Sequence, residues 1–201
     1  MKAFATGIFL FACLSFLISF NPFVPVESKA YPVKKAEGSY KTLFFQSIYR
    51  QISAAGVNLS EEVFSFALNG FDKLQAQGKL NRDSILTIID FSLSSREKRM
   101  FVVDLKSQKL LISSLVSHGR SSGTEFAKKF SNRPESHQSS LGFYITGGTY
   151  RGSNGYSLVL EGLEKGFNDK AKERAIVMHG ADYASEQVIR KKGYLGRSYG
   201  C

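Results

Sequence analysis

The feature that most constrains the fold is a change in hydrophobic period near residue 84. Before it, apolar residues recur every three or four positions over residues 40–55 and 60–77, which predicts two amphipathic helices. Ser60 suits the N-cap of the second helix, and Gly78 suits its end. After it, apolar residues come in short β-branched runs separated by polar turns. The sequence therefore predicts an α+β fold, with an N-terminal helical segment followed by a mainly-β domain.

Six of these runs are predicted to be strands, and the second and third would form a β-hairpin. They cover residues 85–91, 100–104, 110–116, 142–146, 156–160 and 175–179. After the third run, residues 117–140 are polar and show little periodicity. A loop of this length in a compact domain is usually a binding loop or a lid. Residues 147–152 are predicted to be a tight strand connection, since no phosphate-binding pattern follows their glycines.

The first 30 residues have the pattern of a signal peptide. Lys2 precedes an almost wholly apolar run over residues 3–20, and Ser28 and Ala30 are small residues at the positions that a signal peptidase reads. Export to the periplasm or the cell wall is expected. The alternative is an uncleaved membrane anchor, because a run of this length is just enough to span a bilayer. The protein would then meet the membrane only through this leader.

The rest of the chain is divided into a linker and helical region, residues 31–83, and the mainly-β domain, residues 84–201. The net charge limits the kinds of partner that the exported form is expected to bind. The chain carries a net charge of +10, and the leader holds two lysines and one glutamate, so the exported form keeps +9. Such a domain is expected to meet an anionic cell envelope. Nucleic acid is not expected as a partner, because the basic residues are dispersed and no nucleic-acid-binding motif is present.

The use of cysteine points to a reactive thiol. Cys13 lies in the leader, so Cys201 is the only cysteine of the exported form and no internal disulfide can form. An apolar run over residues 175–178 ends on His179 and Gly180. Histidine and cysteine are the pair that thiol catalysis needs, because the imidazole accepts the thiol proton and the thiolate attacks a carbonyl carbon. In this hypothesis, backbone amides around Tyr199, Gly200 and Cys201 stabilise the developing oxyanion.

The same region resembles the murein L,D-transpeptidases with a YkuD-like catalytic domain. Three blocks occur in that family's order: residues 155–168, the His-Gly pair at 179–180, and the Arg-Ser-Tyr-Gly-Cys block at 197–201. The likeness runs from about residue 101 to the end and is closest to a divergent branch whose last block reads Arg-Ser-x-Gly-Cys. It implies an L,D-transpeptidase-like catalytic domain over residues 84–201, with Cys201 as the nucleophile and His179 as the base.

The resemblance also implies a reaction. The substrate would be a peptidoglycan stem peptide, cleaved between the L-centre of meso-diaminopimelate and D-alanine through a thioester acyl-enzyme, in cell-wall cross-linking or remodelling. No cofactor is expected, and carbapenem β-lactams should acylate the thiol. Gly180, Arg197, Ser198 and Tyr156 are predicted to position the substrate or the turn. The acceptor of the acyl group is open between a second stem peptide, water and a protein amine.

Two other functions stay open at this point. His118, His137, His179 and Cys201 could together satisfy a zinc site of a cell-wall hydrolase, but none has the spacing of a common metal motif, so no metal is predicted. His118 and His137 are expected to be solvated. The chain could also be an inactive or truncated wall-binding homologue. The family continues beyond its nucleophile, so the catalytic domain is expected to be incomplete at its C-terminus, where a terminal carboxylate would disfavour the thiolate.

Overall fold

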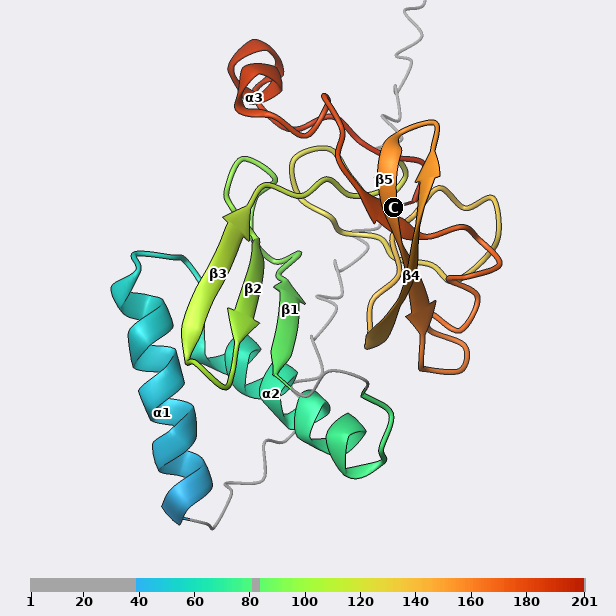
Figure 1. The fold of residues 1–201 in the computed structure, drawn as a ribbon. Coiled ribbons are helices and arrows are strands. Elements are labelled where there is room, and N and C mark those ends of the chain that lie inside the picture. Colours follow the sequence, from blue (N-terminus) through green and yellow to red (C-terminus); the bar gives the residue numbers. More distant parts are fainter. Residues whose placement is uncertain (1–38, 81–83, 201) are drawn as a thin grey trace, which may run out of the picture. The chain divides into compact units, whose positions relative to one another are not determined.

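The structure, a computed structural model, describes residues 39–80 and 84–200 (Figure 1). The predicted leader and linker and the predicted nucleophile lie outside these residues. Two helices come first, α1 (Ser39–Ala54) and α2 (Glu61–Ala76). Ser60 caps α2 as predicted, because its hydroxyl oxygen accepts the Val63 N–H at 3.2 Å. Beyond the end of α2, Gly78 takes a positive φ of 65°, a conformation that favours glycine at helix ends.

The first sheet contains β1 (Ile85–Ile89), β2 (Met100–Asp104) and β3 (Lys109–Ser114), antiparallel in that order. The predicted hairpin of the second and third strands is confirmed. The first strand ends two residues earlier than predicted because Asp90 turns the chain: its carboxylate accepts both the N–H and the hydroxyl of Ser92.

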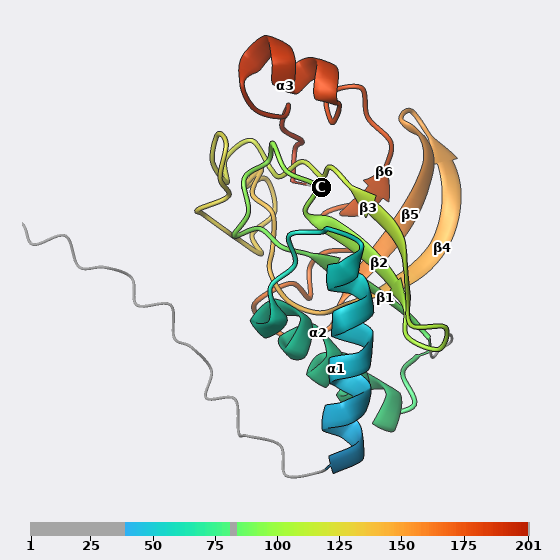
Figure 2. The same ribbon diagram turned by 90° about the vertical axis from the view of Figure 1, so that its left-hand side faces the viewer.

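One hydrophobic core joins both helices to this sheet, as Figures 1 and 2 show by the position of α1 and α2 beside β1–β3. Its members are the buried apolar side chains of the two helices, the sheet and the connections next to them: Ile48, Ile52, Leu59, Phe64, Ala67, Leu68, Phe71, Ile88, Phe101, Val103 and Leu105. The apolar stripes predicted for the two helices therefore face the sheet. This packing explains why the helices form, because helices of this length are marginally stable alone.

The second sheet contains β4 (Tyr144–Gly152), β5 (Gly155–Gly162) and β6 (Val177–His179), again antiparallel and in chain order. The prediction of a tight connection at residues 147–152 is wrong. These residues belong to β4, and Gly147 and Gly148 coincide with a shift in its pairing to β5 between Thr146 and Thr149. Glycine often marks such a bulge inside a strand.

A third helix, α3 (Glu186–Lys192), was not predicted; it ends at Gly193, whose φ is 82°. It lies far from α1 and α2 in both views (Figures 1 and 2). Within residues 39–80 and 84–200, no helix combines the length and the apolar character needed to cross a bilayer. The three helices and two antiparallel sheets of the described residues confirm the predicted α+β class.

Candidate active site

The turn of residues 197–200 is fixed against the chain at residues 118–120. Gly119 and Ser198 form an isolated parallel bridge. In it, the Ser198 N–H donates to the His118 carbonyl at 3.0 Å, and the Arg120 N–H donates to the Ser198 carbonyl at 2.8 Å. The turn that leads into the predicted nucleophile is therefore held by backbone bonds to a segment almost 80 positions earlier in the chain.

Ser198 and Gly200 shape this turn from within. The Ser198 side chain is buried, and its hydroxyl oxygen accepts the Gly200 N–H at 3.1 Å. Gly200 has a φ of 130°, where a residue with a side chain is strained. Among the predicted oxyanion donors, the Gly200 N–H is thus engaged, whereas the Tyr199 N–H donates to no residue that the structure describes. Cys201 lies outside the described residues.

His179 ends β6 and is paired in register with Ser157 of β5. Its Nδ1 lies 2.8 Å from the carbonyl oxygen of Gly180. A carbonyl oxygen can only accept a hydrogen bond, so Nδ1 carries the proton and Nε2 keeps its lone pair. This tautomer is the one that a general base needs, and the contact gives Gly180 a role in orienting the ring through its backbone.

Two contacts bring the end of β6 beside the 197–200 turn. The Tyr183 ring meets the His179 ring edge-on at 6.4 Å between centroids, while the Tyr183 carbonyl accepts the Gly196 N–H at 2.9 Å. On the other side, a Cβ added to Gly200 would lie 3.5 Å from Cδ1 of Ile176, just before β6. The structure therefore places the predicted base next to the turn that precedes the predicted nucleophile.

Arg197 and Tyr199 point outward from the same turn. Nη1 of Arg197 donates to the carbonyls of Arg120, at 3.2 Å, and Gly123, at 3.1 Å. This side chain therefore connects the turn to the long polar loop. The Tyr199 ring is 72% exposed, with the Arg120 guanidinium 4.5 Å from its centroid and the His137 ring at 5.4 Å. The segment predicted as a loop over residues 117–140 contains no helix or strand, only two isolated bridges.

Tyr156 lies differently from the other predicted site residues. It precedes Ser157, the partner of His179, and successive side chains of a strand point to opposite faces. The Tyr156 ring is accordingly on the other face of the sheet from His179. It is 68% exposed and has Arg151 over it at 5.7 Å. Its role in substrate positioning stays a prediction that this arrangement does not favour.

Arg174 is a residue of the site that the sequence analysis missed. Its guanidinium donates to the carbonyls of Ser131, at 2.7 Å, and Gln138, at 2.6 Å, and to the Ser140 hydroxyl. A Cβ added to Gly200 would lie 3.4 Å from Arg174 Nη2. Arg174 therefore holds the polar loop against the 197–200 turn. No local pattern marks it, because an arginine before a short strand looks like any solvated charge.

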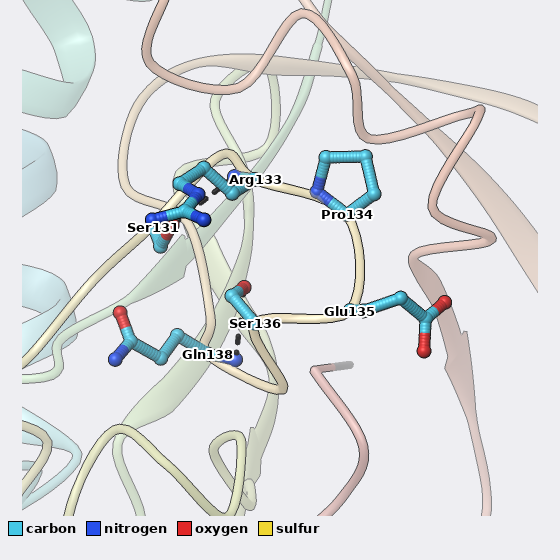
Figure 3. Close-up of a pocket in the computed structure, with 6 residues that line it drawn as sticks. All are labelled: Ser131, Arg133, Pro134, Glu135, Ser136 and Gln138. Carbon is cyan, nitrogen blue, oxygen red and sulfur yellow. Dashed lines mark hydrogen bonds between the residues drawn. The ribbon is translucent and has the colours of Figure 1, made fainter.

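The part of the loop that Arg174 holds surrounds a cavity of about 400 Å³. Figure 3 shows its lining, in which Ser131 Oγ accepts the Arg133 N–H and Ser136 Oγ accepts the Gln138 N–H. The lining residues are Ser131, Arg133, Pro134, Glu135, Ser136 and Gln138. The cavity is thus walled by the predicted binding loop itself, on the side of the loop that approaches Gly200 through Gln138.

His118 is buried, so the expectation of a solvated histidine is wrong for it. Arg99, fully buried, places Nη2 2.8 Å from His118 Nδ1 and donates to the carbonyls of Val116 and Leu93. Burial, and then the Arg99 cation, lower the pKa of His118 to about 4. Burial also lowers the pKa of Arg99, to about 10, so it stays charged at neutral pH.

The contact with Arg99 decides what His118 can bind. Since Arg99 can only donate, Nδ1 of His118 accepts and the ring proton sits on Nε2, which has no hydrogen-bond partner among the described residues. Neither nitrogen then offers a lone pair to a metal ion. The zinc hypothesis loses one of its four predicted ligands. Over residues 39–80 and 84–200, no group of three or more histidine, cysteine or acidic side chains is arranged to hold a metal.

Comparison with protein families gives one match. The model of a YkuD-like family, described as the L,D-transpeptidase catalytic domain, matches residues 56–201, well over half of the chain. The chain belongs to this family. The family predicted from the three sequence blocks is confirmed, and L,D-transpeptidase-type chemistry follows at the level of the family. Searches among curated proteins and among solved structures found no match.

The L,D-transpeptidase match begins before α2, so it takes in this helix together with both sheets. The contacts of α2 agree with that extent. It packs on the first sheet through the common core, and Phe66 stacks on Phe143, next to β4, at 5.4 Å. The family also implies a substrate related to peptidoglycan.

Proposed function

We propose that this L,D-transpeptidase domain transfers acyl groups of peptidoglycan stem peptides through a thioester on Cys201, with His179 as the general base. The observation that carries the proposal is the hydrogen bond between His179 Nδ1 and the Gly180 carbonyl. It leaves Nε2 able to accept a proton beside the turn that delivers residue 201.

The proposed reaction has two halves. His179 Nε2 takes the proton of the Cys201 thiol, and the thiolate attacks the carbonyl between the L-centre of meso-diaminopimelate and D-alanine. The carbon–nitrogen bond breaks, and the imidazolium returns the proton to the departing amine of D-alanine. An acceptor amine then attacks the thioester carbonyl and loses a proton to Nε2, the carbon–sulfur bond breaks, and the imidazolium returns the proton to the departing thiolate. Of the predicted oxyanion donors that the structure describes, the Tyr199 N–H is the one left available for the oxyanion.

The proposed setting is outside the cytoplasm. The motive is the leader over residues 1–30, which lies outside the described residues, together with the net charge of +10, which suits an anionic envelope. Mass spectrometry of the exported protein should find Tyr31 at the N-terminus. Recovery of the intact leader from membranes would instead show an anchor.

The test is turnover of a stem tetrapeptide ending in D-alanine, with a D-amino acid as the acceptor amine. The full chain should release D-alanine and form the exchanged peptide. Cys201→Ala should abolish both products, and His179→Gln should slow them by about a hundredfold or more. Cys13→Ala removes the only other cysteine and is the matched control, with unchanged turnover expected. Turnover that persists in Cys201→Ala would overturn the proposal.

A further inference from the structure

Two arginines at the 197–200 turn, Arg120 and Arg197, have no acidic partner among the described residues. Arg120 and Arg197 are exposed, and no carboxylate among the described residues forms an ion pair with either. Two other exposed cations in this half of the chain do approach a carboxylate, since Lys172 pairs with Glu161 and Arg190 lies 3.7 Å from Glu186. Among the described residues, the positive charge of these two arginines is therefore not compensated by an ion pair at the candidate active site.

Arg120 is held in place at both of its ends. Its backbone N–H donates to the Ser198 carbonyl, and its carbonyl accepts from Arg197. Its guanidinium carbon lies 4.5 Å from the centroid of the Tyr199 ring, a distance that allows cation–π attraction. No described residue accepts a hydrogen bond from this guanidinium. The head group is thus oriented in advance, with its N–H donors left for a ligand.

We infer that Arg120, stacked on Tyr199, is a subsite for a carboxylate of the donor stem peptide. Guanidinium recognises a carboxylate through two parallel N–H donors, which a neutral amide cannot match. Tyr199 is two residues from Cys201, so their Cα atoms are at most about 7 Å apart. The α-carboxylate of the departing D-alanine lies one residue beyond the scissile carbonyl, which is within that span. The inference rests on the proposed function.

The first experiment measures the charge at the thiol without requiring turnover. Iodoacetate and iodoacetamide alkylate the same thiolate but differ by one carboxylate, and peptide mapping by mass spectrometry reports the rate at Cys201. In Arg120→Gln the iodoacetate-to-iodoacetamide rate ratio should fall by about threefold or more, since one nearby charge is lost. In 1 M salt the difference between parent and variant should largely disappear. An unchanged ratio in Arg120→Gln would overturn the inference.

Two controls separate the subsite from general charge and from folding. Arg190→Gln removes another exposed arginine, from α3, and should leave the rate ratio unchanged. Tyr199→Phe keeps the ring under Arg120 and should keep the ratio, whereas Tyr199→Ala should lower it toward that of Arg120→Gln. A fall in Arg190→Gln as large as in Arg120→Gln would mean that net charge, not the stacked arginine, sets the ratio.

The second experiment identifies the carboxylate. Three donor tetrapeptides are compared: one unmodified, one ending in D-alaninamide, and one amidated at the D-centre carboxylate of diaminopimelate. The parent should turn over the D-alaninamide donor about tenfold more slowly than the unmodified donor, and Arg120→Gln should remove most of that difference. Discrimination against the other amidated donor instead would reassign the subsite to that carboxylate. Equal rates for all three would overturn the subsite alone, whereas no turnover of any would overturn the proposed function as well.

Discussion

At the scale of single residues, Ser198 is the hydroxyl most tightly built into the candidate site. Its backbone bridges residues 118–120, and its side chain accepts the Gly200 N–H at 3.1 Å. Ser198→Ala keeps the backbone bridge to residues 118–120 and removes the hydrogen bond to the Gly200 N–H. The turn should therefore stay against residues 118–120 but hold residue 201 less rigidly. We expect turnover of the stem peptide to fall about tenfold, because small misplacements of a nucleophile are costly.

The same variant separates positioning from proton transfer. Alkylation of Cys201 by iodoacetamide should persist in Ser198→Ala, since the hydroxyl has no part in activating the thiol. Ser185→Ala removes a hydroxyl whose one hydrogen-bond partner among the described residues is the Asp182 carbonyl, and it should change neither turnover nor alkylation. Loss of alkylation in Ser198→Ala would show that Ser198 takes part in proton transfer.

His118 makes stability depend on pH at the residue scale. Its pKa is about 4 in the folded protein, below the ordinary value of 6.5, so the unfolded chain takes up this proton first as the pH falls. This contribution to the free energy of unfolding is complete above pH 6.5 and is lost as the pH drops toward 4. A shift of this size corresponds to about 3 kcal/mol at most.

The prediction can be measured by urea unfolding at several pH values. His118→Asn keeps an acceptor for Arg99 but does not titrate. Between pH 7 and pH 4 the free energy of unfolding of the parent should therefore fall by up to about 3 kcal/mol more than that of the variant. His137→Gln, at the partly exposed histidine of the same loop, is the control and should follow the parent. Parallel curves for the parent and His118→Asn would contradict the buried, neutral state of His118.

At the scale of elements, the connection after β5 depends on Asn168. Its side chain is fully buried, donates to the Phe143 carbonyl at 2.9 Å and accepts the Glu164 N–H at 2.8 Å. Asn168→Ala would leave the Glu164 N–H without this acceptor next to the second sheet. We expect thermal unfolding to show a loss of about 2 kcal/mol.

A partly exposed asparagine lies nearby and serves as the matched control. Asn132 donates to Asp169 at 2.7 Å in an exposed contact, and Asn132→Ala should cost no more than about 0.5 kcal/mol. If the two alanine variants unfold at the same temperature, the connection does not depend on the buried amide.

The elements differ in how clearly the sequence predicts them. Helical stripes and β-branched runs predicted both long helices and all six strands, because their burial is periodic. The glycines of β4 predict a turn from sequence alone, because a bulge inside a strand and a turn use the same residue. α3 was missed because seven residues without a buried side chain leave no stripe to detect.

At the scale of the whole molecule, the candidate site is assembled from three distant segments. Residues 118–120 hold the 197–200 turn, β6 presents His179, and Arg174 holds the polar loop beside Gly200. The sequence could predict His179 and the Arg-Ser-Tyr-Gly-Cys block as parts of the site, because a family resemblance rests on short runs of consecutive residues. It could not predict Arg120, Arg174 or the buried pair of Arg99 and His118, since their partners are set by tertiary contacts alone.

The central claim is that Cys201, activated by His179, is the nucleophile that forms the acyl-enzyme in this domain. The most direct measurement is peptide-mapping mass spectrometry after exposure to a carbapenem, whose strained amide opens when a thiolate attacks its carbonyl. We predict an adduct of the drug's mass on the peptide that contains Cys201, retained in Cys13→Ala, absent in Cys201→Ala and formed about a hundredfold more slowly in His179→Gln. An adduct on any other residue, or none on Cys201 with His179 intact, would contradict the account.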